Sequence, residues 1–257
     1  MDMQLKQRVA VVTGASSGLG LHFARRLAAA GASVALMARR AERLQTAVAQ
    51  IEAAGGTARA FSLDVADAKA IGPALDAAQD ALGPISIMIN NAGVGGEGAA
   101  LDIPVEVWDD TFAVNVRGVF FGAREAARRM LDNGEAGAGR ARILNIASIG
   151  AHAVLPGLAA YCASKAAVTQ MTRVLAREWA RQDIAVNALC PGYIETELNA
   201  HWFAAEGGQR QLRGWPRRRL MDAADLDQAL LMLVGPGARR ITGSVITLDD
   251  GQTLLGA

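Results

Sequence analysis

The sequence contains few cysteines, and the two that it has are not close together. Cys162 and Cys190 are the only cysteines among 257 residues, and neither belongs to a closely spaced set. Their separation argues against a disulfide framework, a thiolate zinc site and a CxxC redox pair. Free thiols are typical of a reducing compartment, so we expect a cytoplasmic protein.

An excess of charge and a long apolar run are also missing. Twenty-six basic residues face 25 acidic ones, a net charge of +1, which gives no general attraction to nucleic acid or to an anionic membrane. The N-terminal stretch Met1–Arg8 is polar, and the apolar run Val9–Val12 is too short for a signal-peptide core or a membrane span. The three histidines His22, His152 and His201 are scattered, so we expect no metal site.

Hydrophobic residues, in contrast, make up 51% of the chain, enough for a large core. Short apolar runs rich in β-branched residues predict seven strands: Arg8–Thr13, Ser33–Arg39, Thr57–Asp64, Ile85–Asn90, Arg142–Ala147, Ile184–Leu189 and Ser244–Asp249. Longer segments with helical spacing separate them: Leu19–Ala30, Ala41–Ala54, Asp67–Leu82, Pro104–Leu131, Leu158–Arg181 and Ala223–Val234.

This alternation predicts an α/β fold with one doubly wound parallel sheet of seven strands, of the Rossmann type. Each strand is a nearly continuous apolar run, so helices must cover both faces of the sheet. No proline-rich linker or repeat divides the chain, and we expect residues 1–257 to form a single domain. The segment at about 194–221 has no clean strand pattern and predicts an irregular lid over a site.

A glycine-rich turn follows the first predicted strand and leads directly into a helix. In Thr13–Gly20, Gly14 permits a tight turn, Gly18 lets backbone N–H groups approach a pyrophosphate, and Gly20 lets the helix pack on the strand. The helix N-terminus adds partial positive charge. A glycine-rich turn without a ligand is the simpler alternative for an isolated match of this kind.

Polar residues end the third and fourth predicted strands at the same edge of the sheet. Asp64 lies in Leu63–Val65 and could accept a hydrogen bond from an adenine amino group. The small residues of Asn90–Gly93 would let a ring or a ribose pass close to the backbone. Aspartate and asparagine are also ordinary turn residues, so either one alone is weak evidence.

The end of the second predicted strand indicates which dinucleotide would bind. An NAD-selective site needs an acidic residue there, but the sequence has Ala38, Arg39 and Arg40. Arginine pairs well with phosphate oxygens, so NADP(H) is favoured over NAD(H), with Arg39 as the expected ligand of the 2′-phosphate. Arg40 could also pair with this phosphate. The alternative, that the two arginines are solvated charges that open the next helix, is more serious for Arg40 than for Arg39.

Two residues in the fifth predicted helix indicate proton chemistry. Tyr161 and Lys165 are four residues apart, which places the phenol and the ammonium on one helix face. The chain has three lysines, Lys6, Lys69 and Lys165, and uses arginine elsewhere. A lysine ammonium would reach a ribose hydroxyl and lower the pKa of the neighbouring tyrosine from its usual value of about 10.

Ser148 and Asn115 complete this group of candidate residues. Ser148 follows the fifth predicted strand, where its hydroxyl would hold a substrate carbonyl beside Tyr161. Asn115 stands in an apolar helix, where an amide without partners would be unfavourable. The alternatives are a serine that caps a helix, a tyrosine packed at an interface and an asparagine bonded to the backbone.

Together these motifs resemble the classical short-chain dehydrogenase/reductase family over nearly the whole chain. Thr13–Gly20 is similar to its cofactor turn, Asn90–Gly93 to its NNAG element, and Cys190–Thr196 to the segment that touches the nicotinamide. The resemblance implies a catalytic tetrad of Asn115, Ser148, Tyr161 and Lys165. Cofactor contacts would come from Gly14, Ser16, Ser17, Gly18, Leu19, Gly20, Arg39, Asp64, Val65, Asn91, Ala92, Gly93, Tyr161, Lys165, Pro191, Gly192, Ile194 and Thr196.

The implied reaction is hydride transfer between a nicotinamide and a ketone or secondary alcohol. Tyr161 would give or take the proton, Ser148 would orient the oxygen, Lys165 would bind ribose, and Asn115 would hold a water that links Lys165 to solvent. The resemblance also implies a homotetramer, with pairing of the two long helices and a second interface near Leu254 and Leu255. Both helices also carry apolar residues outside the single stripe that would pack on the sheet, as expected if a second face is buried in an interface: Val116, Phe120, Phe121, Val168 and Met171.

The segment at about 194–221 carries the information on substrate. Trp202, Phe203 and Trp215 predict an apolar surface and therefore a hydrophobic ketone. Arg217–Arg219 permits an alternative, in which arginines meet the phosphates of a coenzyme A or carrier-protein 3-oxoacyl thioester. An epimerase or dehydratase would need a larger C-terminal domain. A nucleotide-sensing or scaffold protein that has lost its chemistry is an alternative of another class.

Overall fold

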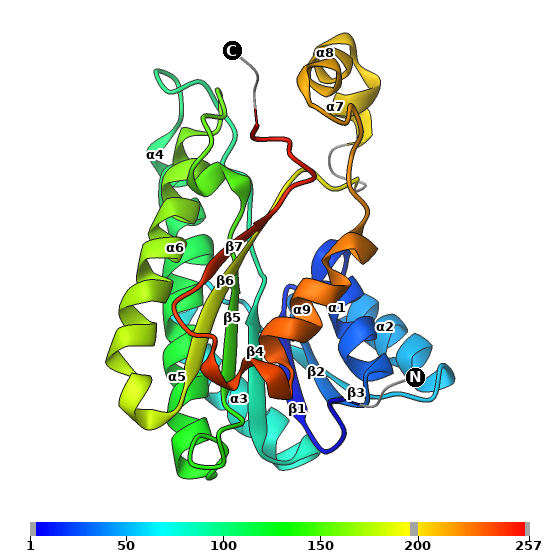
Figure 1. Cartoon of the computed structure of the whole chain (residues 1–257), viewed down its shortest axis with the longest axis vertical. Coiled ribbons are helices and arrows are strands. Elements are labelled where there is room, and N and C mark those ends of the chain that lie inside the picture. Colours follow the sequence, from blue (N-terminus) through cyan, green and yellow to red (C-terminus); the bar gives the residue numbers. More distant parts are fainter. Residues whose placement is uncertain (1–3, 196–199, 255–257) are drawn as a thin grey trace.

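Seven parallel strands form one sheet in the computed structural model, which describes residues 4–195 and 200–254. The order across the sheet is β3-β2-β1-β4-β5-β6-β7 (Figure 1). The strands are β1 Val9–Thr13, β2 Ser33–Ala38, β3 Thr57–Ser62, β4 Ile85–Asn90, β5 Arg142–Ile146, β6 Ala185–Pro191 and β7 Val245–Leu248. The predicted Rossmann-type sheet is therefore confirmed, with small shifts at the strand ends.

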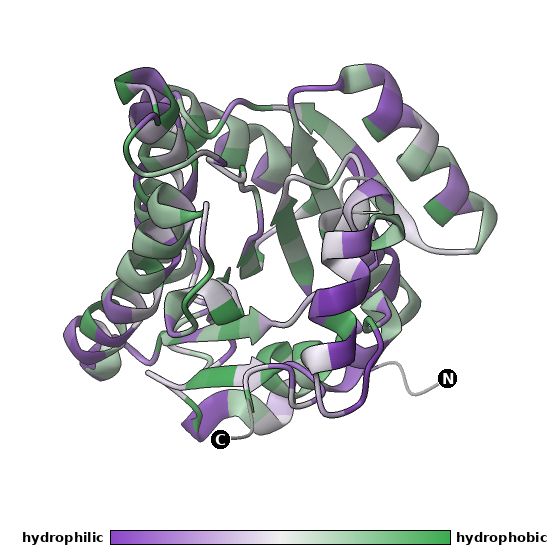
Figure 2. Cartoon of the chain, turned by 90° about the horizontal axis from the view of Figure 1, so that it is seen from above, coloured by the Kyte–Doolittle hydropathy of each residue, from purple (hydrophilic) through white to green (hydrophobic). Residues whose placement is uncertain are grey.

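Successive side chains of each strand point to opposite faces of the sheet. Helices cover both faces because the side chains on each face are apolar. Ala10 and Val12 of β1 belong to one core, and Val9 and Val11 belong to the other. On the first face lie α1 Gly18–Ala29, α2 Ala41–Ala53 and α9 Asp227–Val234; on the second lie α3 Ala68–Leu82, α5 Val119–Asp132 and α6 Ala159–Glu178 (Figure 1). In Figure 2 the hydrophobic colours concentrate on the sheet between the two helical layers.

The strand order reverses direction at β1, which pairs with β2 on one side and with β4 on the other. In an open parallel sheet this reversal opens a crevice at the carboxyl ends of the strands, where ligands bind. The glycine-rich turn follows β1, Asn91 follows β4 and Ser148 follows β5. The topology therefore brings the candidate residues to one edge of the sheet.

Two segments differ from the helices that the sequence predicted. The expected helix Pro104–Leu131 is divided into α4 Val105–Phe112, a π-helical segment η1 Ala113–Gly118, and α5. The lid segment, residues 194–221, is not irregular throughout, because it contains α7 Ala200–Ala204 and α8 Glu206–Gly214. In Figure 1 these two helices lie beyond the carboxyl edge of the sheet.

Across residues 4–195 and 200–254, no helix has the length and apolar character needed to cross a lipid bilayer.

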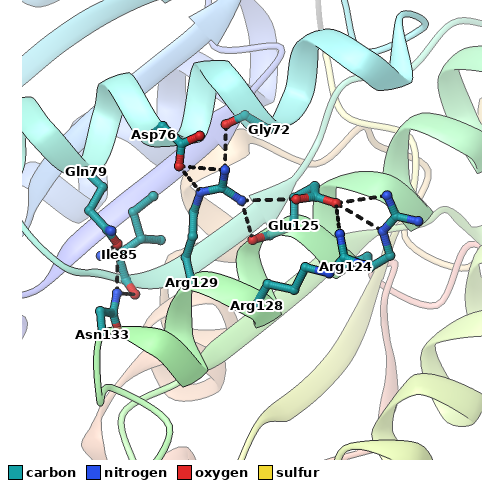
Figure 3. Close-up of polar contacts among 9 residues, drawn as sticks. All are labelled: Gly72, Asp76, Gln79, Ile85, Arg124, Glu125, Arg128, Arg129 and Asn133. Carbon is teal, nitrogen blue, oxygen red and sulfur yellow. Dashed lines mark hydrogen bonds and ion pairs between the residues drawn. The ribbon is translucent and has the colours of Figure 1, made fainter.

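A group of charged residues joins α3 to α5 on the outside of the second helical layer (Figure 3). The Glu125 carboxylate accepts hydrogen bonds from Arg124 at 2.9 Å, Arg128 at 2.9 Å and Arg129 at 3.2 Å. Arg129 also pairs with Asp76 of α3 at 2.7 Å. Burial alone would raise the pKa of Glu125, but the hydrogen bonds of Arg124 and Arg129 and the charge of Arg128 outweigh it and hold that pKa below its ordinary value of 4.5.

We expect Glu125→Gln to lower the free energy of unfolding at pH 7 by about 1 kcal/mol, because three arginines lose a common anionic partner. A carboxyl whose pKa is lowered by folding stabilises the native state above its unfolded pKa, and this contribution is lost as the pH falls through the folded value. Urea denaturation at pH 7 and at pH 3.5 should therefore show a difference that shrinks in acid. Glu178→Gln, at an exposed position of α6, is the control; a deficit that is equal at both pH values would contradict this account.

Candidate active site

The turn after β1 packs closely against the end of β4, the neighbouring strand in the sheet, and can lie close to a ligand. Gly14 and Gly18 have positive φ angles of 68° and 53°, which side chains rarely adopt. A Cβ on Gly20 would collide with the Gly14 carbonyl oxygen and lie 2.5 Å from Asn91 Nδ2. Ser17, at the N-cap of α1, makes no side-chain capping bond, and the first turn of α1 has no acidic residue. The N-terminal N–H groups of α1 can therefore receive an anion.

Thr13 and Asn91 hold this turn to the end of β4. Thr13 Oγ1 accepts hydrogen bonds from the backbone N–H groups of Asn91 at 3.0 Å and Ala92 at 3.1 Å. The Asn91 amide donates to the Thr13 carbonyl oxygen at 2.9 Å. The side chain of Asn91, a predicted cofactor ligand, is thus used within the protein to fix the turn.

Arg40, for which a solvated charge was the more serious alternative, contacts the glycine-rich turn. Its guanidinium donates to Ser16 Oγ at 2.8 Å and to Ser17 Oγ at 2.7 Å. Arg39, the expected phosphate ligand, has a side chain that is 73% exposed and lies 3.8 Å from Asp64. Arg40 is exposed and is the N-cap residue of α2, so it does open the next helix. Its bonds to two hydroxyls of the neighbouring turn are contacts that the sequence of the strand end does not reveal.

Asp64 and Val65 lie at the same edge, after β3. Asp64 Oδ1 accepts from the backbone N–H of Ala66 at 3.0 Å and so stabilises its own turn. Val65 is buried, and its backbone oxygen lies 2.9 Å from where a Cβ on Gly118 would be. Gly118 ends the π-helical segment η1, so the close approach of η1 to Val65, in the segment after β3, requires a glycine there.

Lys165 is almost completely buried, with 4% of its surface exposed. Its Nζ donates a hydrogen bond to the carbonyl oxygen of Ile146, the last residue of β5, at 2.9 Å. Burial lowers the pKa of Lys165 to about 8. Nζ lies 5.6 Å from the centre of the Tyr161 ring and 3.4 Å from where a Cβ on Gly93 would be. The structure thus brings Gly93, Tyr161 and Lys165 together, as the sequence predicted.

Tyr161 lies between Lys165 and the turn after β5. Gly150 makes room for it, since a Cβ there would be 3.2 Å from the tyrosine ring. Burial raises the pKa of Tyr161, and the hydrogen bond with Ser148 lowers it by less. We expected Lys165 to lower the pKa of Tyr161, and in the protein without a bound cofactor this was wrong. The Lys165 ammonium donates to a backbone carbonyl oxygen, and burial of the phenol is the largest influence on the pKa of Tyr161.

Ser148 is positioned by the short 3₁₀ helix η2 Ile149–Ala151, for which it is the N-cap. Its Oγ accepts a hydrogen bond from the backbone N–H of Gly150 at 3.1 Å. The helix-capping alternative is therefore present, and it leaves the hydroxyl O–H of Ser148 able to interact with Tyr161 or with a substrate oxygen. Capping and a site role are compatible at this residue.

Asn115 is completely buried in the π-helical segment η1. Its Oδ1 accepts from the Val94 N–H at 2.9 Å, and its Nδ2 donates to the Val94 carbonyl oxygen at 2.9 Å and to Ser164 Oγ at 3.0 Å. Both N–H donors of the amide therefore have protein partners, so the water that the resemblance implied would have to donate to an oxygen atom of Asn115. π-helical insertions in helices are frequent at functional sites.

A chain of buried amides below this group was missed in the sequence. Asn90 donates to Asn145 Oδ1 at 2.9 Å, and Asn145 donates to Thr172 Oγ1 at 2.9 Å. These bonds tie β4, β5 and α6 together directly beneath the site. The signal in the sequence was an asparagine within each of two largely apolar, buried strands, where an amide must find partners.

The segment after β6 carries the remaining predicted cofactor residues. Pro191 ends β6, and Gly192 packs so closely on the C-terminal segment that a Cβ there would lie 2.8 Å from Asp249 Cα. Ile194 is buried and pairs with Met221 at the base of the lid segment. Thr196 and Leu255, which the sequence also singled out, lie outside the described residues.

Aromatic residues of the lid segment form a packed cluster of their own. The Tyr193 ring stacks on Trp215 with centroids 5.4 Å apart and meets Phe203 edge-on at 5.5 Å. Phe203 and Trp215 are buried, whereas Trp202 is 46% exposed. The expectation of an apolar surface built from all three residues is therefore wrong for Phe203 and Trp215, which form the interior of the lid.

Two other charged groups are paired in ways the sequence did not show. Arg217 and Arg219 both pair with Asp250, at 3.2 Å and 2.8 Å. His22 of α1 contacts Asp227 of α9 at 2.6 Å. Among the residues that the structure describes, no three histidine, cysteine or acidic side chains are arranged to hold a metal ion.

The edge as a whole fits a dinucleotide. Gly14 and Gly20 let the turn pack against Asn91 and Ala92, Gly18 has open space where a Cβ would be, and the first turn of α1 has no acidic residue. Arg40 and the hydroxyls of Ser16 and Ser17 supply hydrogen-bond donors at the same turn. Tyr161 and Lys165 lie across the crevice, beside the strands at its other side.

Comparison with known proteins agrees with this geometry. A family model described as short chain dehydrogenase matches residues 8–207. Gluconate 5-dehydrogenase from Gluconobacter oxydans (strain 621H) is 35% identical over 95% of this chain and 94% of its own length. A short-chain dehydrogenase/reductase from Serratia marcescens BCRC 10948 superposes with a TM-score of 0.90 at 34% identity, covering 97% of this chain and 99% of that one.

A third relative was solved with a cofactor. A gluconate 5-dehydrogenase from Burkholderia cenocepacia J2315, in complex with NADP and tartrate, gives a TM-score of 0.92 at 30% identity, over 99% of this chain and 98% of that one. Fold, site and relatives together define an oxidoreductase that acts on CH–OH groups with a nicotinamide dinucleotide. The chain belongs to the short-chain dehydrogenase family.

We expect Gly20→Ala to abolish detectable NADPH binding and to lower the free energy of unfolding by about 1–3 kcal/mol, because the new methyl group collides with backbone. Fluorescence titration and urea denaturation measure the two effects. Gly214→Ala is the control, since it places a methyl group in open space at the end of α8. Tight NADPH binding by Gly20→Ala would show that the cofactor does not use this turn.

Proposed function

We propose that this enzyme transfers hydride between NADP(H) and a ketone or secondary alcohol, with a largely apolar carbonyl compound as substrate. The observation that carries the proposal is the convergence of Ser148, Tyr161 and Lys165 with the glycine-rich turn at one edge of the sheet. The hydride chemistry belongs to the cofactor, which supplies the hydride when bound. The protein contributes binding, orientation and proton transfer.

Tyr161 is the proposed proton donor in carbonyl reduction. Its raised pKa keeps the phenol protonated at neutral pH, so Oη can donate a proton to a carbonyl oxygen that becomes an alkoxide. Ser148, the hydrogen-bond partner of Tyr161, would hold the same oxygen and fix its position. Gly150 lets the ring lie against the turn after β5, so the phenol and the serine hydroxyl are held in a defined relation.

We assign Lys165 two roles, which are to bind ribose and to relay a proton. One of its three N–H donors is used by the Ile146 carbonyl oxygen, and the others can bind ribose hydroxyls and relay a proton toward Tyr161. A lysine pKa of about 8 lies near working pH, which favours proton exchange. We assign Asn115 a positioning role, because its amide ties the Val94 backbone to Ser164 of α6.

The apolar substrate is supported by the side chains exposed near the site. Val94 follows the Gly93 turn and is 38% exposed, Val154 follows η2 and is 91% exposed, and Trp202 projects from α7. The rival 3-oxoacyl thioester would use arginines of the lid segment, but Arg217 and Arg219 both pair with Asp250, which shares its single negative charge between them. The intact group of Ser148, Tyr161 and Lys165 also disfavours a nucleotide sensor without catalysis.

The test of this reaction is NADPH oxidation by the purified enzyme with a cyclic ketone, with an aromatic ketone and with acetoacetyl coenzyme A, together with gluconate oxidation by NADP⁺. We expect turnover of the cyclic or the aromatic ketone to exceed that of acetoacetyl coenzyme A and that of gluconate. Tyr161→Phe should lower kcat by about 100-fold or more while NADPH binding survives.

Tyr193→Phe is the comparison variant for this experiment, because it removes the hydroxyl of the chain's other tyrosine, which is stacked on Trp215 and raises the pKa of Tyr161 only as a minor cause after burial. It should keep activity within about threefold. A salt-sensitive preference for the thioester would replace the substrate assignment. Full activity in Tyr161→Phe would refute the proton-donor role.

The preference for NADP(H) rests on two arginines with different surroundings. Arg39 is exposed and can turn toward a 2′-phosphate, and Arg40 is already held at the turn by Ser16 and Ser17. An acidic residue, which would select the free 2′-hydroxyl of NAD, is absent from the end of β2. We propose that the phosphate lies between Arg39 and the hydrogen-bonded pair of Arg40 and Ser16.

We expect Arg39→Ala and Arg40→Ala each to reduce kcat/KM for NADPH by about tenfold or more, with little change for NADH, because one charge-assisted phosphate bond is lost. Arg59→Ala, which removes a surface arginine paired with Glu52, is the control. The ratio of kcat/KM values for NADPH and NADH measures the effect. If neither substitution alters that ratio, the 2′-phosphate binds elsewhere.

A further inference from the structure

A cationic cavity lies at the opposite edge of the sheet from the active site. Its volume is about 300 Å³, and the residues that line it are Gln4, Lys6, Arg8, Ala138, Gly139, Arg140, Arg142 and Pro236. Arg8 directly precedes β1 and Arg142 begins β5, so the cavity lies at the amino ends of the strands. This volume is at the lower end of the range for small-molecule sites, about 300–1,000 Å³.

The charge of this cavity is strongly one-sided. Four of its lining residues, Lys6, Arg8, Arg140 and Arg142, are cationic, and no acidic residue of the described chain lines it. The whole chain has a net charge of only +1, so this concentration is local. Like charges placed together are unfavourable unless an anion joins them.

Nearby carboxylates compensate only part of this charge. Arg140 pairs with Glu135 next to the cavity. Arg239 reaches Asp183 at 3.4 Å, while its guanidinium lies against Gly139 of the lining. The Arg8 guanidinium donates to Ser86 Oγ at 2.8 Å and to the Arg140 carbonyl oxygen, both neutral acceptors. Within the described residues, Lys6 and the two buried arginines, Arg8 and Arg142, form no ion pair with a carboxylate. Glu135 and Asp183 act on Arg8 and Arg142 only through their charge, and Glu135 Oε2 is itself buried without a hydrogen-bond partner.

Arg142 is the most informative of these residues. It is 2% exposed, its Nη1 donates to the Ala141 carbonyl oxygen at 2.9 Å, and its Nε has no hydrogen-bond partner in the part of the chain that the structure describes. An unpaired buried donor on a charged group is costly, and such groups are rare in folded proteins. Burial, followed by the charge of Arg142, lowers the pKa of Arg8 to about 10, so the two guanidinium groups oppose one another.

We propose that this cavity is a second ligand site, which binds a small dianionic oxyanion of the phosphate class. A dianion would neutralise Arg8 and Arg142 together and would accept hydrogen bonds from guanidinium and ammonium donors. The site is separate from the hydride chemistry, because β5 runs from Arg142 to Ile146, about 13 Å of extended chain, before the Lys165 contact. The proposal does not depend on the identity of the substrate.

Isothermal titration calorimetry and thermal unfolding in phosphate-free buffer test this site. The probes are inorganic phosphate and glycerol 3-phosphate, and sodium chloride at equal ionic strength controls for screening. We expect saturable binding of at least one phosphate compound and a concentration-dependent rise in Tm, as for any ligand that binds only the native state. Tighter binding of glycerol 3-phosphate would identify an organic phosphate as the natural ligand, and equal or tighter binding of inorganic phosphate would identify the free ion.

Matched variants locate the binding. Lys6→Gln should weaken phosphate binding about five- to tenfold, whereas Lys69→Gln, at an exposed lysine of α3, should not change it. Ala138→Glu places a carboxylate at the exposed part of the lining and should abolish binding, and Ala77→Glu makes the same change on the exposed face of α3. These surface positions are chosen because Arg142 itself lies in the core, where a substitution could prevent folding.

Arg40→Gln separates this site from the cofactor turn, which also carries phosphate-binding groups. Phosphate binding that persists in Arg40→Gln and is lost in Ala138→Glu supports the cavity. The proposal is overturned if wild type shows no saturable binding, if Lys6→Gln and Lys69→Gln respond alike, or if Arg40→Gln alone removes the response.

Discussion

The burial of one ammonium group, that of Lys165, determines how the active edge is built. A charged group with 4% exposure loses most of its hydration and needs close polar partners. The Ile146 carbonyl oxygen at the end of β5 supplies one, and the close approach of Gly93 leaves space for others on the open side. A larger residue at position 93 would close this space. The lysine, the strand end and the glycine are therefore interdependent.

Hydrogen bonds between buried polar side chains make this arrangement rigid. Asn115 connects Val94 to Ser164 of α6, on the same helix as Tyr161 and Lys165. Asn90, Asn145 and Thr172 connect the two central strands to that helix from beneath. Because each donor has an acceptor, the polar groups fix the positions of their elements rather than destabilise the core. Proton transfer needs such fixed distances between donor and acceptor.

Much of the fold was predictable because each strand is a short apolar run and each helix repeats its apolar residues at helical spacing. The glycine-rich turn and the pair Tyr161 and Lys165 were predictable for a related reason, since their spacing lies within one turn or one helix. The π-helical segment at Asn115 was not, because it depends on contacts with Val94 and Ser164, which are distant in sequence.

The features that the sequence did not reveal at Arg40, at Tyr161 and in the lid segment share a physical cause. Arg40 is held by hydroxyls on another turn, the pKa of Tyr161 depends on burial that no local pattern encodes, and Phe203 and Trp215 pack on Tyr193 instead of facing a ligand. The same limit applies to the cationic cavity, whose residues come from three separate parts of the chain. Local sequence patterns predict elements, whereas contacts between distant segments decide the environment of each side chain.

The central claim is that this edge of the sheet holds a nicotinamide and a carbonyl group in contact. The most direct measurement is mass spectrometry of the alcohol formed from an apolar ketone and NADPH carrying deuterium at both C4 positions. The account predicts one deuterium on the carbinol carbon of the product and a proton from solvent on its oxygen. Product without deuterium on that carbon, or NADPH binding with no reduction of any ketone, would contradict it.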